Sequence, residues 1–397
     1  MRLDWSVWLE SVVSQAARAS WPAHERAGED TKVEEEVVEA HHMFRTAIFI
    51  LAGLISYLTT GWLINGPVWL RSLDIPNHRS SHTQPTPRLG GLGIVASFVL
   101  LLPLLWILLL PDSGNWLFAT RFGLAILGYV VIAVVGLIDD MRRIRPLTKY
   151  LGQLIAALIA IWSGVTFLHL DLPYLGRLDL ALAGTFGGLI GAALTILWLT
   201  GFSNIFNFMD GIDGLAGGSG LIYALALAVV CGMTGHRLLA AGSLILAAAC
   251  LGFLLHNFPP ARIFLGDVGS LFIGYVLAAF AVLTTNSGVR PVPFPSVILI
   301  FAPFIYDTTL TLILRWRRGE RLHEAHRSHL YQRLISHGQG HRQVSLTYYG
   351  LNLVLGLLGI AYVQVVDPWR VALLMTGLTI LVGFTIYVYW IEARRTA

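Results

Sequence analysis

Eleven long apolar runs divide the sequence and constrain its fold more than any other feature. Each run holds about 20 residues, enough for a helix to cross about 30 Å of hydrocarbon with its backbone hydrogen bonds satisfied internally. With 55% hydrophobic and only 13% charged residues, the chain is too apolar for an ordinary soluble protein. We therefore predict an all-α, polytopic integral membrane protein of about eleven transmembrane helices. The runs lie at about 44–64, 90–110, 117–138, 150–169, 181–203, 215–234, 237–256, 269–286, 292–314, 344–365 and 369–391.

Composition within the runs predicts how the chain is organised. The runs at 215–234, 237–256 and 269–286 are rich in Gly and Ala, which let helices approach closely in lipid, so we expect them in the packed interior. The segment 169–179 is expected to form a small β-hairpin.

The predicted domains are a polar extension at 1–43, a membrane-embedded domain at 44–392 and a short tail at 393–397. The extension contains no signal-peptide run, and Met43 is an alternative start because it opens directly onto the first run.

Lys and Arg residues are distributed unequally between the two sets of loops. One set, with the C-terminal tail, holds 17 of them and the other holds 5. The positive-inside rule then predicts a bacterial inner-membrane protein with the basic loops and the C-terminus in the cytoplasm. The same charges would also contact anionic membrane lipid, which is an alternative reason for their presence.

Two of the basic loops carry groups suited to phosphate or to a cation. The loop from Asp74 to Arg88 contains Arg79 and Arg88, which can bind phosphate, although its prolines also suit a purely structural turn. Asp139 and Asp140 are adjacent at the end of the third run, where two carboxylates tend to hold a proton or collect a cation. Alternatively, they pair with the arginines that follow them.

A stripe of amides and carboxylates ends the fifth run. Asn204, Asn207, Asp210 and Asp213 recur at every third position, so on a helix their oxygens would converge at one place. Gly211 would allow the helix to break there. Four polar groups between two apolar runs are costly unless they bind something.

Asp267 and a histidine-rich loop complete the polar groups on this side. Asp267 lies between glycines at the start of the eighth run, where it could bind a cation or simply cap a helix. His326 and His329 would share a face if their segment were helical. Zinc is a rival explanation for the histidines, but the surrounding arginines favour a diphosphate. Together these loops favour phosphoryl transfer at a membrane surface with Mg²⁺.

These motifs resemble the polyprenyl-phosphate N-acetylhexosamine-1-phosphate transferase family. The resemblance rests on Asp139-Asp140, the segment from Asn204 to Gly214, the segment from Phe264 to Ser270, and the loop that contains His329. It covers roughly residues 44–390 and is greatest to the branch that initiates O-antigen and thus lipopolysaccharide synthesis. The phospho-MurNAc-pentapeptide translocases are more distant members.

The resemblance implies a reaction and a role for each candidate residue. N-acetylhexosamine-1-phosphate would pass from a UDP-N-acetylhexosamine to undecaprenyl phosphate, and UMP would leave. Catalytic roles fall to Asp139, Asp140 and Asp267, and Mg²⁺, or Mn²⁺ in its place, would be held by Asn207 and Asp267. The implied substrate-binding residues are Arg79, Arg88, Lys149, Asn204, Asp210, Asp213, His326 and His329. The family also allows a homodimer, and no nucleic-acid partner is expected.

The chain departs from the family pattern in the histidine-containing loop. Tyr331 and Gln332 stand where histidines often occur in relatives, which puts the sugar or diphosphate contacts there in question. The departure favours N-acetylfucosamine, N-acetylquinovosamine or N-acetylglucosamine over a muramoyl pentapeptide. The alternatives are a membrane transporter, with Asp307 inside a run, a different membrane phosphotransferase, or a protein that binds the polyprenyl phosphate without catalysis.

Overall fold

The structure, a computed structural model, describes residues 26–66, 72–74, 85–109, 116–286, 290–321 and 326–396. The chain divides into two compact units, Met1–Leu51 and Ala52–Ala397. Every candidate site residue belongs to the second unit. Arg79, which we predicted to bind substrate, lies outside the described residues.

Each of the eleven predicted runs corresponds to a long helix, so the all-α prediction is confirmed. Within the described ranges, nine of these helices are long and apolar enough to cross a membrane, and α3 and α5 are not among the nine. The helices are α2 (Arg26–Asn65), α3 (Gly91–Leu109), α4 (Trp116–Arg142), α5 (Pro146–Ser163), α6 (Gly184–Phe208), α7 (Leu215–Met233), α8 (Arg237–Asn257), α9 (Gly266–Asn286), α10 (Phe294–Arg317), α12 (His341–Gln364) and α13 (Trp369–Thr396).

Helix α9 lies at the centre of the second unit. In its most apolar stretch 94% of the residues are buried, compared with 72% in α7 and 22% in α13. It contacts α3, α4, α6, α7, α8 and α10. Because all sides of α9 pack against protein, Ser270 and other small residues of this helix allow the close contacts that an interior position requires. The predicted interior position is confirmed for α7 and α9, whereas α8, with 50% of its apolar stretch buried, is only partly enclosed.

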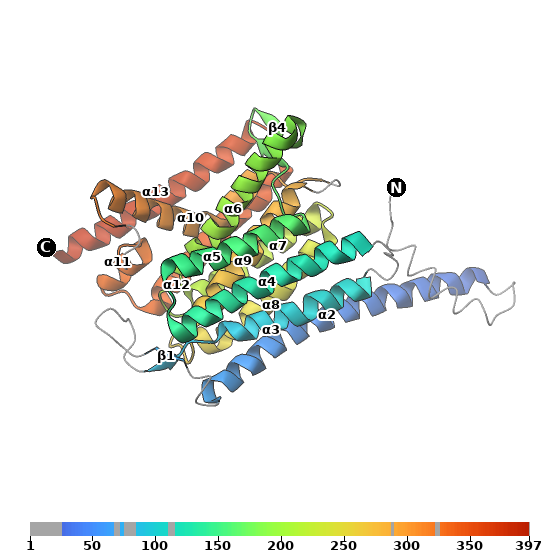
Figure 1. Ribbon diagram of the computed structural model, residues 1–397, viewed down its shortest axis with the longest axis horizontal. Helices are drawn as coiled ribbons and strands as arrows, with labels where there is room; N and C mark the ends of the chain where they lie inside the picture. The colour runs from blue at the N-terminus through green and yellow to red at the C-terminus, as the bar shows by residue number, and fades with distance from the viewer. Residues whose placement is uncertain are drawn as a thin grey trace. The chain divides into compact units, whose positions relative to one another are not determined.

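Short elements connect the helices at their ends. Strands β1 (Leu73–Asp74) and β2 (Thr86–Pro87) pair antiparallel, as do β3 (His169–Leu172) and β4 (Gly176–Asp179), which form the predicted hairpin. A 3-10 turn, η2 (Ala181–Ala183), precedes α6, and a seven-residue helix, α11 (Leu330–Ser336), lies between α10 and α12. Figure 1 shows β1 and α11 on the left of the helices and β4 at the top. The candidate residues gather at the end with β1 and α11.

Candidate active site

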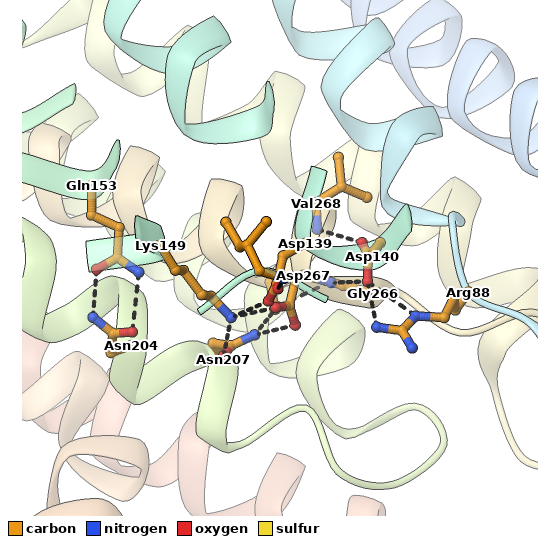
Figure 2. A network of polar contacts seen from close by, with 12 residues as sticks. Arg88, Asp139, Asp140, Lys149, Gln153, Asn204, Asn207, Gly266, Asp267 and Val268 are labelled. Atoms are coloured by element: carbon orange, nitrogen blue, oxygen red, sulfur yellow. Dashed lines mark hydrogen bonds and ion pairs between the residues drawn. The ribbon is translucent and has the colours of Figure 1, made fainter. Parts of the chain in front are cut away.

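The centre of the candidate site is an ammonium group held between two carboxylates. Lys149, in the first turn of α5, forms ion pairs with Asp139 at 3.0 Å and with Asp267. The amide nitrogen of Asn207 donates to Asp267 at 2.8 Å, and its amide oxygen lies 3.4 Å from the lysine nitrogen. Figure 2 shows these four side chains, from α4, α5, α6 and α9, pointing toward one another. The fold therefore joins four residues that the sequence placed at separate helix ends.

The cluster holds more carboxyl groups than cations. Asp139 and Asp267 face the single ammonium of Lys149, and the three side chains are only about one-fifth exposed or less. An uncompensated carboxylate in such a half-buried site attracts a cation. The Asn207 amide oxygen and the Asp267 carboxylate already converge on a positive group, the lysine ammonium, and these oxygen types are the ones that Mg²⁺ prefers. The donor set therefore fits a hard cation.

Asp140 has different partners from its neighbour Asp139. Its carboxylate is buried and accepts the backbone N–H groups of Asp267 at 3.0 Å and of Val268 at 2.9 Å. The guanidinium of Arg88 donates to the same carboxylate from Nε at 3.2 Å and Nη2 at 3.1 Å. Asp140 thus caps α9 from another helix and satisfies N–H groups that have no partner within α9. Its cationic partner is distant in sequence and is not one of the arginines that follow it.

A glycine permits this cap. Gly266 has a φ of +73°, which favours glycine, and begins α9 directly beside Asp140. A Cβ at Gly266 would lie 2.7 Å from Asp140 Oδ2 and 2.1 Å from the backbone oxygen of Arg88. The glycine therefore provides both the backbone conformation and the space that the carboxylate needs.

The polar stripe of α6 is divided among three sets of partners. Asn204 exchanges two hydrogen bonds with Gln153 of α5, at 2.6 and 3.1 Å, whereas Asn207 joins the Lys149 cluster. Asp213 accepts the backbone N–H of residue 261 at 3.1 Å and lies 3.3 Å from His341. The expectation that all four oxygens converge is wrong, because α6 ends at Phe208 and the last two aspartates leave its helical face.

Asp210 lies in the turn between α6 and α7. None of the hydrogen bonds found within the described ranges reaches its carboxylate, in contrast to Asp213. Burial raises the pKa of the Asp210 carboxyl well above its usual range, and the negative charges of Asp267 and Asp140 raise that pKa further. A carboxyl group in this position holds a proton readily and would lose that proton to solvent if a cation bound to it.

The condition for a shared helical face of His326 and His329 is not met. His329 is the N-cap residue of α11, and residues 326–328 before it are not helical. The rings of His326 and His329 are nevertheless in contact, with centroids 5.0 Å apart. Burial and the nearby His329 and Arg315 lower the pKa of His326 to about 4, so its imidazole is neutral at neutral pH.

Several residues that surround the site were not predicted from the sequence. Gln153 and Ser270 hydrogen-bond Asn204 and Asn207, respectively. Gln153 is four residues from Lys149, so a polar stripe on the helical run was a signal for it. Ser270 is an unremarkable small residue in an apolar helix. Asp307 was expected only as an acidic residue inside a run, because its partners on α11 and α12 lie far along the chain.

A family model and several known proteins that match this chain all describe glycosyl or sugar-phosphate transferases. The family model for glycosyl transferase family 4 matches residues 122–285. A decaprenyl-phosphate N-acetylglucosaminephosphotransferase of Mycolicibacterium smegmatis is 35% identical over 85% of this chain and 86% of its own length. A probable undecaprenyl-phosphate N-acetylglucosaminyl 1-phosphate transferase of Bacillus subtilis is 31% identical, over 78% and 83%. A phospho-N-acetylmuramoyl-pentapeptide-transferase of Heliobacterium modesticaldum is 29% identical, over 79% and 95%.

Proposed function

The chain belongs to glycosyl transferase family 4, and on this basis we propose a specific reaction for it. The relatives to which it is similar are polyprenyl-phosphate sugar phosphotransferases. We propose that it transfers N-acetylhexosamine-1-phosphate from a UDP-sugar to undecaprenyl phosphate and releases UMP. N-acetylglucosamine is the first sugar to test, because it occurs in the names of the relatives from M. smegmatis and B. subtilis. The product would begin a lipid-linked glycan such as an O-antigen.

The proposed chemistry requires one P–O bond to form and one to break. An oxygen of the lipid phosphate attacks the phosphorus that carries the sugar, and the bond from that phosphorus to the bridging oxygen of the UDP-sugar breaks. UMP leaves with the bonding electrons. Enzymes of this reaction class act mainly by positioning the phosphates and neutralising their charge. The cluster at the start of α5 and α9 has the groups that both tasks need.

Each side chain of the Lys149 cluster then has a role. Lys149 contacts the diphosphate, since its ammonium can leave the carboxylates for a phosphate oxygen within reach of the same cluster. Asp139 positions the acceptor phosphate and accepts its proton. Asn207 and Asp267 would hold Mg²⁺, or Mn²⁺ in its place, and the ion would supply charge neutralisation for the diphosphate.

The remaining predicted residues divide into two groups. Asp140 acts as a positioning residue, because its carboxylate is already occupied by Arg88 and by α9. Asn204 and Asp213 likewise hold neighbouring elements. Asp210 and His326 are both half-buried, and among the described residues no hydrogen bond to another element occupies either side chain. We propose that they contact the uridine or sugar end of the UDP-sugar.

The membrane setting follows from the basic loops. The end that carries α11 and the cluster also carries most of the Lys and Arg residues, so we place it in the cytoplasm of a bacterial inner membrane. UDP-sugars are soluble and anionic, and undecaprenyl phosphate presents its phosphate at the membrane surface. A cluster located at a helix-bundle end can receive both substrates.

The convergence of Lys149, Asn207 and Asp267 from three helices is the observation that carries the proposed reaction.

The direct test is UMP release by the purified full-length protein. Undecaprenyl phosphate and Mg²⁺ would be supplied with a panel of UDP-N-acetylhexosamines, with and without a chelator. The proposal predicts UMP from one donor, dependent on both lipid and metal. Absence of UMP from every donor, together with retained binding of undecaprenyl phosphate, would instead support a carrier-binding protein without transferase activity.

A further inference from the structure

Asp307 is a buried carboxylate within α10, and the proposed reaction does not use it. Its side chain is 1% exposed. An acidic residue inside a membrane-spanning helix is costly unless its oxygens are fully occupied, and it usually marks a functional element. Such a residue was the main sequence feature in favour of a transporter.

The partners of Asp307 come from three different helices. Oδ1 accepts the backbone N–H of Leu330 at 2.9 Å, and Oδ2 accepts that of Tyr331 at 3.4 Å, both at the start of α11. The hydroxyl of Thr311 on α10 donates to Oδ1 at 3.3 Å, and that of Tyr348 on α12 donates to Oδ2. The carboxylate is therefore the point at which α10, α11 and α12 are joined.

Helix α11 depends on such external partners. Seven residues are too few for a helix to persist in water on its own. Asp307 satisfies its first N–H groups, and Nδ1 of His329, the N-cap residue, lies 3.3 Å from Asp307 Oδ1. At the other end of α11, Arg333 forms an ion pair with Glu392 of α13. Two fixed points thus determine where α11 lies.

Helix α11 in turn contacts the turn that carries Asp210. Tyr331 is 1% exposed, and its hydroxyl donates to the backbone oxygen of Phe208, the last residue of α6, at 3.1 Å. Gly211 lies directly against this hydroxyl, since a Cβ there would be 1.9 Å from it. Tyr331, which replaces a histidine of the family pattern, is consequently enclosed between helices. It supports the α6–α7 turn and has no exposed face for a phosphate.

We propose that Asp307 is a positioning residue that acts through α11 and Tyr331 to hold the α6–α7 turn in its binding geometry. The chain of contacts runs from the α10 carboxylate to the start of α11, and from the Tyr331 hydroxyl to Phe208. Asn207 and Asp210 lie on either side of Phe208, so displacement of α11 moves the groups proposed to bind metal and donor. This inference rests on the proposed transferase function for its kinetic readout.

The test is Asp307→Asn in the full-length protein, with Thr308→Val as the matched control. Asn keeps the size of the side chain but loses its charge and presents an amide nitrogen to two of the donors. Thr308 is adjacent and buried, and no partner for its hydroxyl is found in the described part of the chain, so Val removes no hydrogen bond. Two readouts are measured: trypsin cleavage after Arg333, which requires α11 to open, and the kinetics of UMP release with UDP-N-acetylglucosamine.

We expect Asp307→Asn to speed cleavage after Arg333 by about 10-fold and to raise the KM for the UDP-sugar by about 10-fold or more, with a smaller effect on kcat. Thr308→Val should match the wild type in both readouts. Wild-type cleavage and wild-type KM in Asp307→Asn would overturn the proposal. If the wild type releases no UMP from any donor, the transferase proposal fails, and the cleavage assay still decides whether Asp307 holds α11.

If Asp307→Asn does not fold, a second pair of variants tests whether α11 positions the α6–α7 turn through Tyr331. Tyr331→Phe removes one hydroxyl and should raise the KM for the UDP-sugar by about 5-fold without changing cleavage after Arg333. Gly211→Ala should raise the KM further, because its new methyl group meets the Tyr331 hydroxyl, and Tyr331→Phe in that background should restore part of the loss. An additive double mutant would contradict a contact between the two positions.

Discussion

The backbone N–H of Asp267 donates to the carboxylate of Asp140 at 3.0 Å, while the side chain of Asp267 faces Lys149 on the other side. The two adjacent aspartates of α4 therefore interact with different parts of Asp267 on α9, one with its backbone and the other with the lysine bound by its side chain. Asp140 fixes the backbone of α9 at its first turn, and Asp139 shares Lys149 with the Asp267 carboxylate. The end of α4 therefore contacts both the backbone of Asp267 and the lysine that its side chain binds.

Removal of Arg88 should destabilise the protein through Asp140. Arg88→Ala leaves a buried carboxylate without its cation, a change that typically costs about 3–5 kcal/mol, although the remaining bonds from α9 will reduce that cost. We expect a clear drop in Tm in detergent, with Arg88→Lys intermediate because lysine cannot donate from two nitrogens. Arg177→Ala, in the exposed β4 strand, is the control and should leave Tm unchanged.

Gly266→Ala should be far more damaging than Gly319→Ala. Both glycines have a positive φ, +73° and +71°, so each alanine carries a backbone cost of about 1–3 kcal/mol. At Gly266 the new methyl group would also strike Asp140 and Arg88, whereas at Gly319 it would meet nothing within 4 Å. Thermal unfolding of the two variants separates the cost of the clash from that of the backbone. Equal losses in Tm would show that the α9 cap tolerates displacement.

Asp267→Asn should lower UMP release by about 100-fold or more while the protein remains folded. The variant keeps the hydrogen bond to Asn207 in reach but removes the charge that attracts both Lys149 and the proposed cation. Asp179→Asn, at the distant β3–β4 hairpin, should turn over normally. Near-normal turnover by Asp267→Asn, with Tm preserved, would remove Asp267 from the proposed metal site.

Metal removal should abolish UMP release, and Mg²⁺ or Mn²⁺ should restore it. Within the described ranges no three His, Cys, Asp or Glu side chains are grouped to hold a metal, so the ion would depend on substrate phosphates for further ligands. Asn207→Ala should therefore raise the Mg²⁺ concentration for half-maximal activity, by about 10-fold, more than it lowers the maximal rate. Full activity in the presence of a strong chelator would exclude a required cation.

His326 should make stability depend on pH in a defined direction. Its pKa is about 4 in the folded protein and about 6.5 when unfolded, so between these values the unfolded chain binds more protons. The protein should lose stability as pH falls from about 6.5 toward 4, and His326→Gln should lose less. Tm measured at about pH 7 and pH 5 tests this difference. A larger drop in His326→Gln than in the wild type would contradict a neutral, half-buried imidazole.

The fold was largely predictable because lipid imposes a simple rule on sequence. Apolar runs of sufficient length located every long helix, including α5, whose first turns contain Lys149 and Gln153. The helix ends were harder to predict. Helix α9 begins three residues before the predicted run, because Asp140 of α4 accepts hydrogen bonds from its first N–H groups. No property of the run itself could reveal that cap, which depends on a residue of another helix.

Most residues of the site could be identified from the sequence, but the residues that each of them contacts could not. Asp139, Lys149, Asn207 and Asp267 were all singled out, and they do meet. The stripe of α6 could not be resolved from spacing, because a helix that ends at Phe208 sends later residues elsewhere. The contact between Asp307 and α11 could not be predicted from the sequence either, since the two α11 N–H groups that donate to Asp307 lie more than 20 positions away in the chain.

The burial of α9 has a consequence for how the protein is made. A helix with 94% of the residues in its apolar stretch buried by protein has almost no surface left for lipid, so it needs its neighbouring helices to cover it. Five of the helices that contact α9 precede it in the chain and are therefore synthesised before it: α3, α4, α6, α7 and α8. Because Asp267 lies at the start of α9, we expect it to reach Asp139, Asp140 and Lys149 only once α9 has packed among these helices. Packing of the central helix and assembly of the Lys149 cluster should therefore occur together.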